Sequence, residues 1–296
     1  MRYARYIRCL ALSLWILYLP NPLWSLEPPE PAGDQAPPDQ AGPAQPTTDP
    51  GHDGEEHGAR LHWRQLPKNI LMDQKTIFTS PLHIKAKDAK WWLIFGGATA
   101  ALIAKDADIS DQLSNSSRVV GVSKWTSRFG AEYTLIPLAF SFYIGGKLGD
   151  NPRARDTARL GIEALIDAEI TVNIIKQATQ RPRPSEGNGR GRFWDGGDAF
   201  PSGHAINSWA LATVVAHEFP RPRIIPITAY GLATLVVASR FAGKRHFASD
   251  AVLGAGMGWF IGDYVYHKHH GPDRSKTRAA ASWLLTHTHP QIELTR

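Results

Sequence analysis

The sequence predicts an all-α protein, built as a single helical bundle domain of about six to eight helices. Strand signals are scarce, whereas apolar runs of helical length recur from about residue 67 to residue 267. Asn151 followed by Pro152 is a strong helix start, because asparagine caps the first turn and proline fits its first position. Gly254 and Gly258 lie inside one apolar run, where they permit close helix–helix contact.

Two of the expected helices raise the question of a membrane. The apolar stretches 91–104 and 224–239 lie between basic residues and cover about 21–24 Å, against a hydrocarbon core of about 30 Å. Buried core helices of an exported soluble domain are the favoured interpretation, and tilted short membrane spans are the alternative. The expected helices are 67–78, 88–105, 131–147, 152–179, 205–218, 223–241 and 246–267.

The chain before residue 61 has a different composition. Residues 1–26 join a basic start to an apolar run that ends at Pro20, which predicts a signal peptide or an uncleaved signal anchor. Residues 27–60 are rich in proline and acidic residues and predict a disordered linker. Residues 61–296 form the predicted folded domain. We therefore expect an exported protein of a bacterial periplasm or cell envelope, anchored in the membrane if the signal is not cleaved.

Charge and cysteine content narrow the function. The formal net charge is +6 for the whole chain, and the predicted domain is more basic than the whole. Anionic substrates or an anionic membrane surface are the expected partners; no nucleic acid is expected, because no nucleic-acid motif occurs. The only cysteine, Cys9, lies in the predicted signal, which excludes disulfides and thiolate chemistry from the domain.

The segment Pro201-Ser202-Gly203-His204 immediately precedes an expected helix. Backbone N–H groups at a helix N-terminus bind anions, and Gly203 has no side chain to block their approach. His204 is placed to transfer a proton to or from a bound anion. This segment predicts one side of a phosphate-processing site.

Two further blocks flank that segment. Lys176 and Arg183 are seven residues apart and share a helix face if the segment stays helical. Arg240 offers a fork that matches phosphate oxygens. His246 and Asp250 are an i,i+4 pair, so on a helix the carboxylate accepts the Nδ1 proton and leaves the Nε2 lone pair free.

Together the blocks read K-x6-RP, PSGH and SR-x5-H-x3-D. This pattern resembles the type-2 phosphatidic acid phosphatase superfamily, which is shared with bacterial class A acid phosphatases and vanadium haloperoxidases. The resemblance covers roughly residues 85–268 and depends mainly on 176–250. It implies a phosphatase acting on phosphate mono- or diphosphate esters of lipids, isoprenoids or soluble compounds.

The resemblance also implies a role for each motif residue. His246 would be the nucleophile and form a phosphohistidine, with Asp250 holding its ring. His204 would protonate the leaving oxygen and then activate water. No metal or other cofactor is required. A vanadate-dependent haloperoxidase and a non-catalytic phospholipid-binding module remain as alternatives. The phosphate oxygens would be bound by Lys176, Arg183, Arg240 and the N–H groups of Ser202 and Gly203.

Two other basic features are expected to stay outside the site. Arg181 is five residues from Lys176 and should point elsewhere. The tract 267–270 contains three histidines, and we interpret it as a frayed helix end with favourable cations rather than a metal site.

Overall fold

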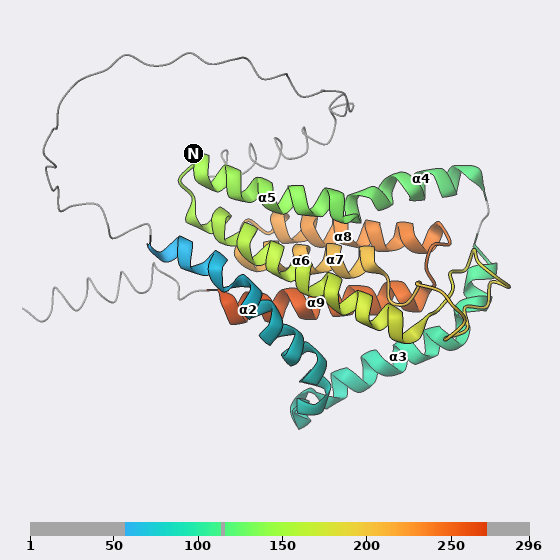
Figure 1. Ribbon diagram of the computed structural model, residues 1–296. Coiled ribbons are helices and arrows are strands. Elements are labelled where there is room, and N and C mark those ends of the chain that lie inside the picture. Colours follow the sequence, from blue (N-terminus) through green and yellow to red (C-terminus); the bar gives the residue numbers. More distant parts are fainter. Residues whose placement is uncertain (1–56, 114–115, 271–296) are drawn as a thin grey trace, which may run out of the picture. The chain divides into compact units, whose positions relative to one another are not determined.

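The computed structural model describes residues 57–113 and 116–270 (Figure 1). The predicted signal and most of the predicted linker lie outside these residues. The chain divides into two compact units, Met1–Pro67 and Lys68–Arg296, and the helical bundle lies in the second. All secondary structure within the described residues is helical. The helices are α2 (His57–Thr79), α3 (Ala86–Asp111), α4 (Ser117–Ser127), α5 (Glu132–Leu148), α6 (Pro152–Thr179), α7 (Gly203–Glu218), α8 (Ile224–Ala242) and α9 (Ala248–His269), with 3-10 turns at Ser80–His83 and Arg128–Gly130.

The all-α prediction is confirmed, and most helix bounds lie close to those expected. Helix α6 has the predicted bounds: the Asn151 side chain accepts a hydrogen bond from the Ala154 N–H, 3.2 Å away, with Pro152 at the first position. Helix α4 was not predicted, because valine, serine and Gly121 all lower its helix propensity. Residues 57–60, expected to be linker, belong to α2.

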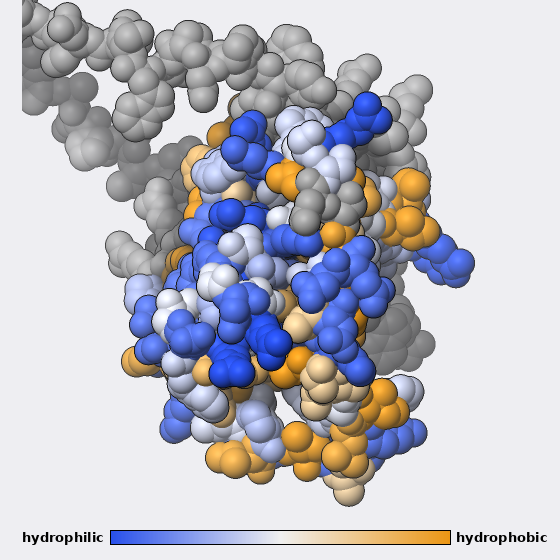
Figure 2. All heavy atoms as spheres, turned by 90° about the vertical axis from the view of Figure 1, so that its right-hand side faces the viewer, coloured by the Kyte–Doolittle hydropathy of each residue, from blue (hydrophilic) through white to orange (hydrophobic). Residues whose placement is uncertain are grey.

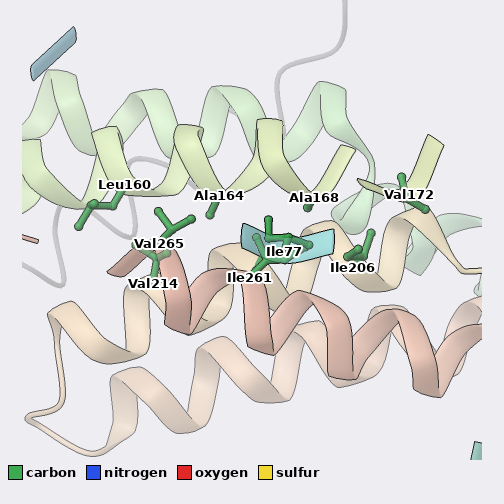
Figure 3. Close-up of a cluster of buried hydrophobic side chains, with 10 residues drawn as sticks. Ile77, Leu160, Ala164, Ala168, Val172, Ile206, Val214, Ile261 and Val265 are labelled. Carbon is green, nitrogen blue, oxygen red and sulfur yellow. The ribbon is translucent and has the colours of Figure 1, made fainter. Parts of the chain in front are cut away.

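Helix α7 is the centre of the bundle and packs against α5, α6, α8 and α9. The main core lies where α6, α7 and α9 meet, with Ile77 of α2 closing one side (Figure 3). Small residues on α6 and α7, such as Ala164 and Ala210, are fully buried there and allow the helix axes to approach closely. The buried members of this core are Ile77, Leu160, Ala164, Ala168, Val172, Ile206, Ala210, Val214, Ile261 and Val265.

Glycines set the spacing between α7 and α9. A Cβ on Gly258 would lie 2.2 Å from the carbonyl oxygen of Ile206, and one on Gly262 would lie 2.5 Å from that of Ala210. Contact this close leaves no room for a side chain, which confirms the role predicted for Gly258. Both pairs advance by four residues in the same direction, so α7 and α9 are parallel. Their N-termini therefore meet at one end of the bundle, and their C-termini meet at the other.

The outer surface of the bundle is unusually apolar. On α5, Tyr133, Ile136, Phe140 and Ile144 are exposed at helical spacing. Helix α8 is, within the described residues, the one helix long and apolar enough to cross a membrane, and only 22% of its most apolar window is buried. The interpretation of this segment as a buried core helix is therefore wrong. At the end of the bundle seen in Figure 2, hydrophilic residues gather centrally and hydrophobic ones lie towards the edges.

Candidate active site

Ser202 is the N-cap of α7 and links the start of this helix to α9. Its backbone N–H donates to the carbonyl oxygen of Asp250, 3.0 Å away. This corrects the prediction that the Ser202 N–H binds phosphate. The Ser202 hydroxyl is buried and has no hydrogen-bond partner among the described residues, so the side chain is the group left to bind a ligand. The N–H groups of Gly203 and His204 begin the helix, where no preceding turn supplies acceptors.

His246 is held by a backbone carbonyl. Its Nδ1 lies 2.7 Å from the carbonyl oxygen of Ala199, and the ring is almost completely buried. Since a carbonyl only accepts, Nδ1 carries the proton and Nε2 presents its lone pair. On that side, Nη2 of Arg240 lies 3.5 Å from Nε2. The nucleophile predicted from the sequence thus has the tautomer that nucleophilic attack requires.

Asp250 supports His246 less directly than predicted. Its Oδ2 lies 3.8 Å from Nδ1 of His246, longer than a hydrogen bond. The reason is that α9 begins at Ala248, so His246 precedes the helix and the two residues do not share a helical face. Oδ2 instead accepts the Phe247 N–H at 2.7 Å. Asp250 therefore fixes the turn that carries His246.

Arg181, which was expected to point elsewhere, lies directly behind this turn. Its Nη1 is 2.7 Å from Oδ1 of Asp250, and its Nη2 is 2.8 Å from Oδ2 of Asp106 on α3. Burial raises the pKa of Asp250 to about 7. Both of its carboxylate oxygens nevertheless accept hydrogen bonds from charged or backbone donors, so the geometry favours the ionised form. Arg181 also donates to Ser249 and to the Gly191 carbonyl, and it contacts the rings of Phe193, Phe200 and Phe247.

The predicted phosphate-binding cations surround His204. Burial first, and then the charges of Arg240, Lys176 and Arg183, lower the pKa of His204 to about 3. The same cations, after burial and with Arg240 first among them, lower the pKa of His246 well below 6.5. Both imidazoles are therefore neutral in a strongly positive environment, which an anionic ligand would complement.

Lys176 and Arg183 reach the site by a route different from the one predicted. Helix α6 ends at Thr179, and Gln180 adopts a left-handed conformation with φ of 44°, so the two residues do not share a helix face. Arg183 is placed by a loop and is paired with Asp198, with 2.8 Å between Nη2 and Oδ2. A Cβ on Gly203 would lie 3.5 Å from Nζ of Lys176, which places that cation beside the start of α7.

The site also contains donors that the protein leaves unsatisfied. Nε of Arg183 and Nε of Arg240 are buried and, like the Ser202 hydroxyl, have no hydrogen-bond partner among the described residues. Unpaired buried donors are costly unless a ligand or water satisfies them. Three such donors lie beside two neutral histidines and the N-terminus of α7, an arrangement that can bind a tetrahedral oxyanion.

Sequence reasoning missed several contributors because they carry no motif. Asp106 lies 75 residues from Arg181, and the Ala199 carbonyl is a backbone group. Asp198 is one of three acidic residues in the glycine-rich loop between α6 and α7, and nothing in the sequence singles it out as the partner of Arg183.

Part of the sequence is similar to known proteins. Residues 160–273 match the model of the PAP2 superfamily. A lipid A 1-phosphatase of Porphyromonas gingivalis is 25% identical over 155 residues, which are 50% of this chain and 32% of the relative. The chain thus spans about a third of the length of that curated relative.

One solved structure has a similar fold. The transmembrane PAP2 type phosphatidylglycerolphosphate phosphatase from Bacillus subtilis has a TM-score of 0.50 and 21% identity, with 64% of this chain and 99% of that chain covered. A weaker likeness is to LpxE of Aquifex aeolicus, with a TM-score of 0.42 and 20% identity, where 54% of this chain and 90% of that chain are covered.

Proposed function

We propose that this chain, a member of the PAP2 superfamily, is a phosphatase that hydrolyses lipid phosphate esters through a phosphohistidine intermediate. The observation that carries the proposal is the set of unsatisfied donors around His246: the Ser202 hydroxyl and the Nε atoms of Arg183 and Arg240. A phosphoryl group placed among them meets Nε2 of His246, whose proton is held on Nδ1 by the Ala199 carbonyl.

In the first step, Nε2 of His246 attacks phosphorus, and the bond to the leaving oxygen breaks. His204, protonated when the anionic substrate binds, gives its proton to that oxygen, so the alcohol leaves neutral. In the second step, His204 takes a proton from water, the hydroxide attacks the phosphohistidine, and inorganic phosphate is released. Lys176, Arg183 and Arg240 offset the charge on the phosphoryl oxygens in both steps.

The surface supports a lipid rather than a soluble ester. Large apolar side chains are exposed on α5 and α8, including Phe140 and Leu235, and both helices lie in the same bundle as the site. Exposed apolar area on this scale is typical of contact with membrane or with another protein. The charged site and the apolar flank together suit an amphiphile with a phosphate headgroup at a membrane, with α8 the candidate for the membrane-spanning helix.

The test is phosphate release by the purified full-length chain in mixed micelles containing EDTA. The substrates are a phosphatidate, an isoprenoid diphosphate, a lipid A 1-phosphate and a soluble aromatic phosphate. We expect turnover of at least one lipid, inhibition by orthovanadate, and a loss of more than about 10⁴-fold in His246→Ala. His83→Ala, an exposed histidine on the turn after α2, is the matched control and should keep full activity.

Several outcomes contradict the proposal in whole or in part. Turnover that requires a divalent metal, or that survives in His246→Ala, excludes the phosphohistidine mechanism. Lipid binding without phosphate release identifies a binding module. Bromide oxidation by the vanadate-loaded chain with peroxide, in the absence of phosphatase activity, identifies a haloperoxidase. Turnover of the soluble ester alone would retain the phosphatase and reject the lipid substrate.

A further inference from the structure

A second group of metal-ligating side chains lies at the opposite end of α7 and α9 from His246. His217 is in the last turn of α7, and Asp263 and His267 share a face of α9. One ligand atom from each of the three lies within 4.8 Å of the others. His217 is 13 residues from His204 along α7, which is about 20 Å, so this group is separate from the phosphate site.

The spacing of these atoms fits a small metal ion. Oδ1 of Asp263 lies 2.9 Å from Nε2 of His217 and 3.4 Å from Nδ1 of His267. Ligands at about 2.0–2.1 Å around tetrahedral zinc are separated by about 3.3 Å. The observed distances lie on either side of that value. Minor side-chain rotation would therefore bring all three atoms to zinc distance without moving either helix.

The contacts within the group are weak ones for a histidine–carboxylate pair. Nε2 of His217 is buried and close to Asp263, yet it does not reach hydrogen-bond geometry with any described residue. Its ring is held by Tyr266, which stacks on it at 4.8 Å and 17°. Nδ1 of His267 lies 2.9 Å from the carbonyl oxygen of Asp263, a local contact that a metal would replace. A buried imidazole nitrogen that is held in orientation, lies close to a carboxylate and lacks a hydrogen bond is suited to a metal ligand.

Another group of three possible metal ligands differs because it already contains a guanidinium. Asp73, Glu163 and His269 also bring their ligand atoms together. There, however, Nη1 of Arg159 lies 3.2 Å from Glu163, and His269 lies 2.7 Å from Asp73. The guanidinium already supplies the positive charge that a metal would bring. Among the residues that form the group on α7 and α9, Asp263 is the only acid and both other members are histidines.

We propose that His217, Asp263 and His267 form a zinc site that ties the C-terminal end of α7 to α9. Two imidazoles and one carboxylate are a donor set that zinc and similar divalent ions prefer, with a remaining position for water. The C-terminal ends of two parallel helices also favour a cation. The tract 267–270, interpreted from the sequence as a frayed end, therefore contributes one ligand, His267. The site is about 20 Å from His204, so zinc would stabilise the C-terminal ends of the two helices without taking part in phosphate release.

Zinc binding to the full-length chain, purified without a histidine tag and stripped with EDTA, tests the proposal. A chromophoric chelator competes for zinc and reports affinity and stoichiometry. We expect His217→Ala and Asp263→Asn to weaken the tight site by more than about 100-fold, because loss of even an outer partner of a metal ligand costs about 10–100-fold. His83→Ala is the matched control. Like Nδ1 of His267, Nδ1 of His83 lies 2.9 Å from the carbonyl oxygen four residues earlier, but no ion pair joins His83 to a carboxylate among the described residues.

A second measurement does not depend on the variants folding. The wild-type chain loaded with Co²⁺ should show the intense visible absorption of a four- or five-coordinate ion with nitrogen ligands, and zinc should raise its melting temperature. The proposal is overturned if wild-type and Asp263→Asn chains bind zinc equally, or if Co²⁺ shows only weak six-coordinate bands. Phosphate release in EDTA is a separate readout, so the failure of this site and the failure of the phosphatase proposal can be told apart.

Discussion

Nη1 of Arg181 lies 2.7 Å from Oδ1 of Asp250, and both side chains are almost fully buried. This ion pair joins the loop after α6 to the first turn of α9, next to the turn that holds His246. Asp106 of α3 binds the other side of the same guanidinium, so three distant segments meet at one charge. The catalytic turn is therefore supported by a buried ion network rather than by a contact with Asp250 alone.

This network predicts different phenotypes for two arginines two residues apart. Arg181→Met leaves the buried carboxylates of Asp106 and Asp250 without a positively charged partner, which should lower the free energy of unfolding by about 3–5 kcal/mol. Arg183→Met breaks only partly exposed ion pairs, with Asp198 at 2.8 Å and Glu186 at 3.9 Å, and should cost less than about 1 kcal/mol.

Thermal unfolding and phosphate release distinguish the two variants. Arg183→Met should keep its melting temperature and lose activity, because Arg183 faces the phosphate site. Arg181→Met should lose both. Equal melting temperatures for the two variants would show that the buried network does not hold the turn.

The contact between His246 and Ala199 predicts a tautomer that survives loss of the Asp250 charge. In Asp250→Asn, the Ala199 carbonyl still accepts from Nδ1, so the Nδ1–H form should persist even where activity falls. Nitrogen NMR of labelled histidine reports the tautomer directly. A mixture of tautomers in this variant, with a single one in the wild type, would show that Asp250 rather than the Ala199 carbonyl fixes the tautomer of His246.

The environment of His204 predicts proton uptake on ligand binding. Burial and neighbouring cations lower its pKa to about 3, so the free enzyme holds it neutral between about pH 5 and 8. A bound oxyanion offsets those cations and should raise the pKa of His204, so orthovanadate binding near neutral pH should take up a proton. Calorimetry in buffers of different ionisation enthalpy measures this uptake, with His204→Gln as the control that abolishes it. Binding without uptake in the wild type would exclude His204 as the acid.

The same shift sets the sign of His204's effect on stability. Its pKa in the folded chain lies below the value of 6.5 expected when unfolded, so the unfolded chain binds the proton more readily. The contribution of His204 is therefore fully present above about pH 6.5 and is lost as the pH falls towards 3. Thermal unfolding of His204→Gln should depend less on pH in this range than that of the wild type.

Local signals account for what the sequence predicted correctly. The Asn151–Pro152 start defined one end of α6, and the three motif blocks contain the cations that the structure brings close to His204. Helix α9 was expected to begin at His246, but it begins at Ala248 after Phe247, which is not a typical cap residue. Because of that difference of two residues, His246 and Asp250 do not share a helical face. Nδ1 of His246 contacts the Ala199 carbonyl instead, and Asp250 accepts the Phe247 N–H.

Non-local and backbone contacts account for what the sequence could not supply. Arg181 and Asp106 have no spacing that relates them, because they meet only when α3 packs near the start of α9. The acceptor on Ala199 belongs to the backbone and so has no signature in side-chain identity. The exposure of α8 was likewise hidden, because an apolar helix has the same composition whether it faces a core or lipid.

Gly258 on α9 lies against α7, whereas Gly231 on α8 has open space around it. Gly258→Ala should destabilise the bundle by about 1–3 kcal/mol or more, because its Cβ would lie 2.2 Å from the carbonyl oxygen of Ile206 and force α7 and α9 apart. Gly231→Ala on α8 is the matched control: nothing lies within 4 Å of its Cβ, so it should stabilise the chain by about 0.5–1 kcal/mol through helix propensity. Since α7 and α9 carry His204 and Asp250, Gly258→Ala should also reduce phosphate release while Gly231→Ala does not. Equal melting temperatures for the two variants would show that α7 and α9 are not in backbone contact.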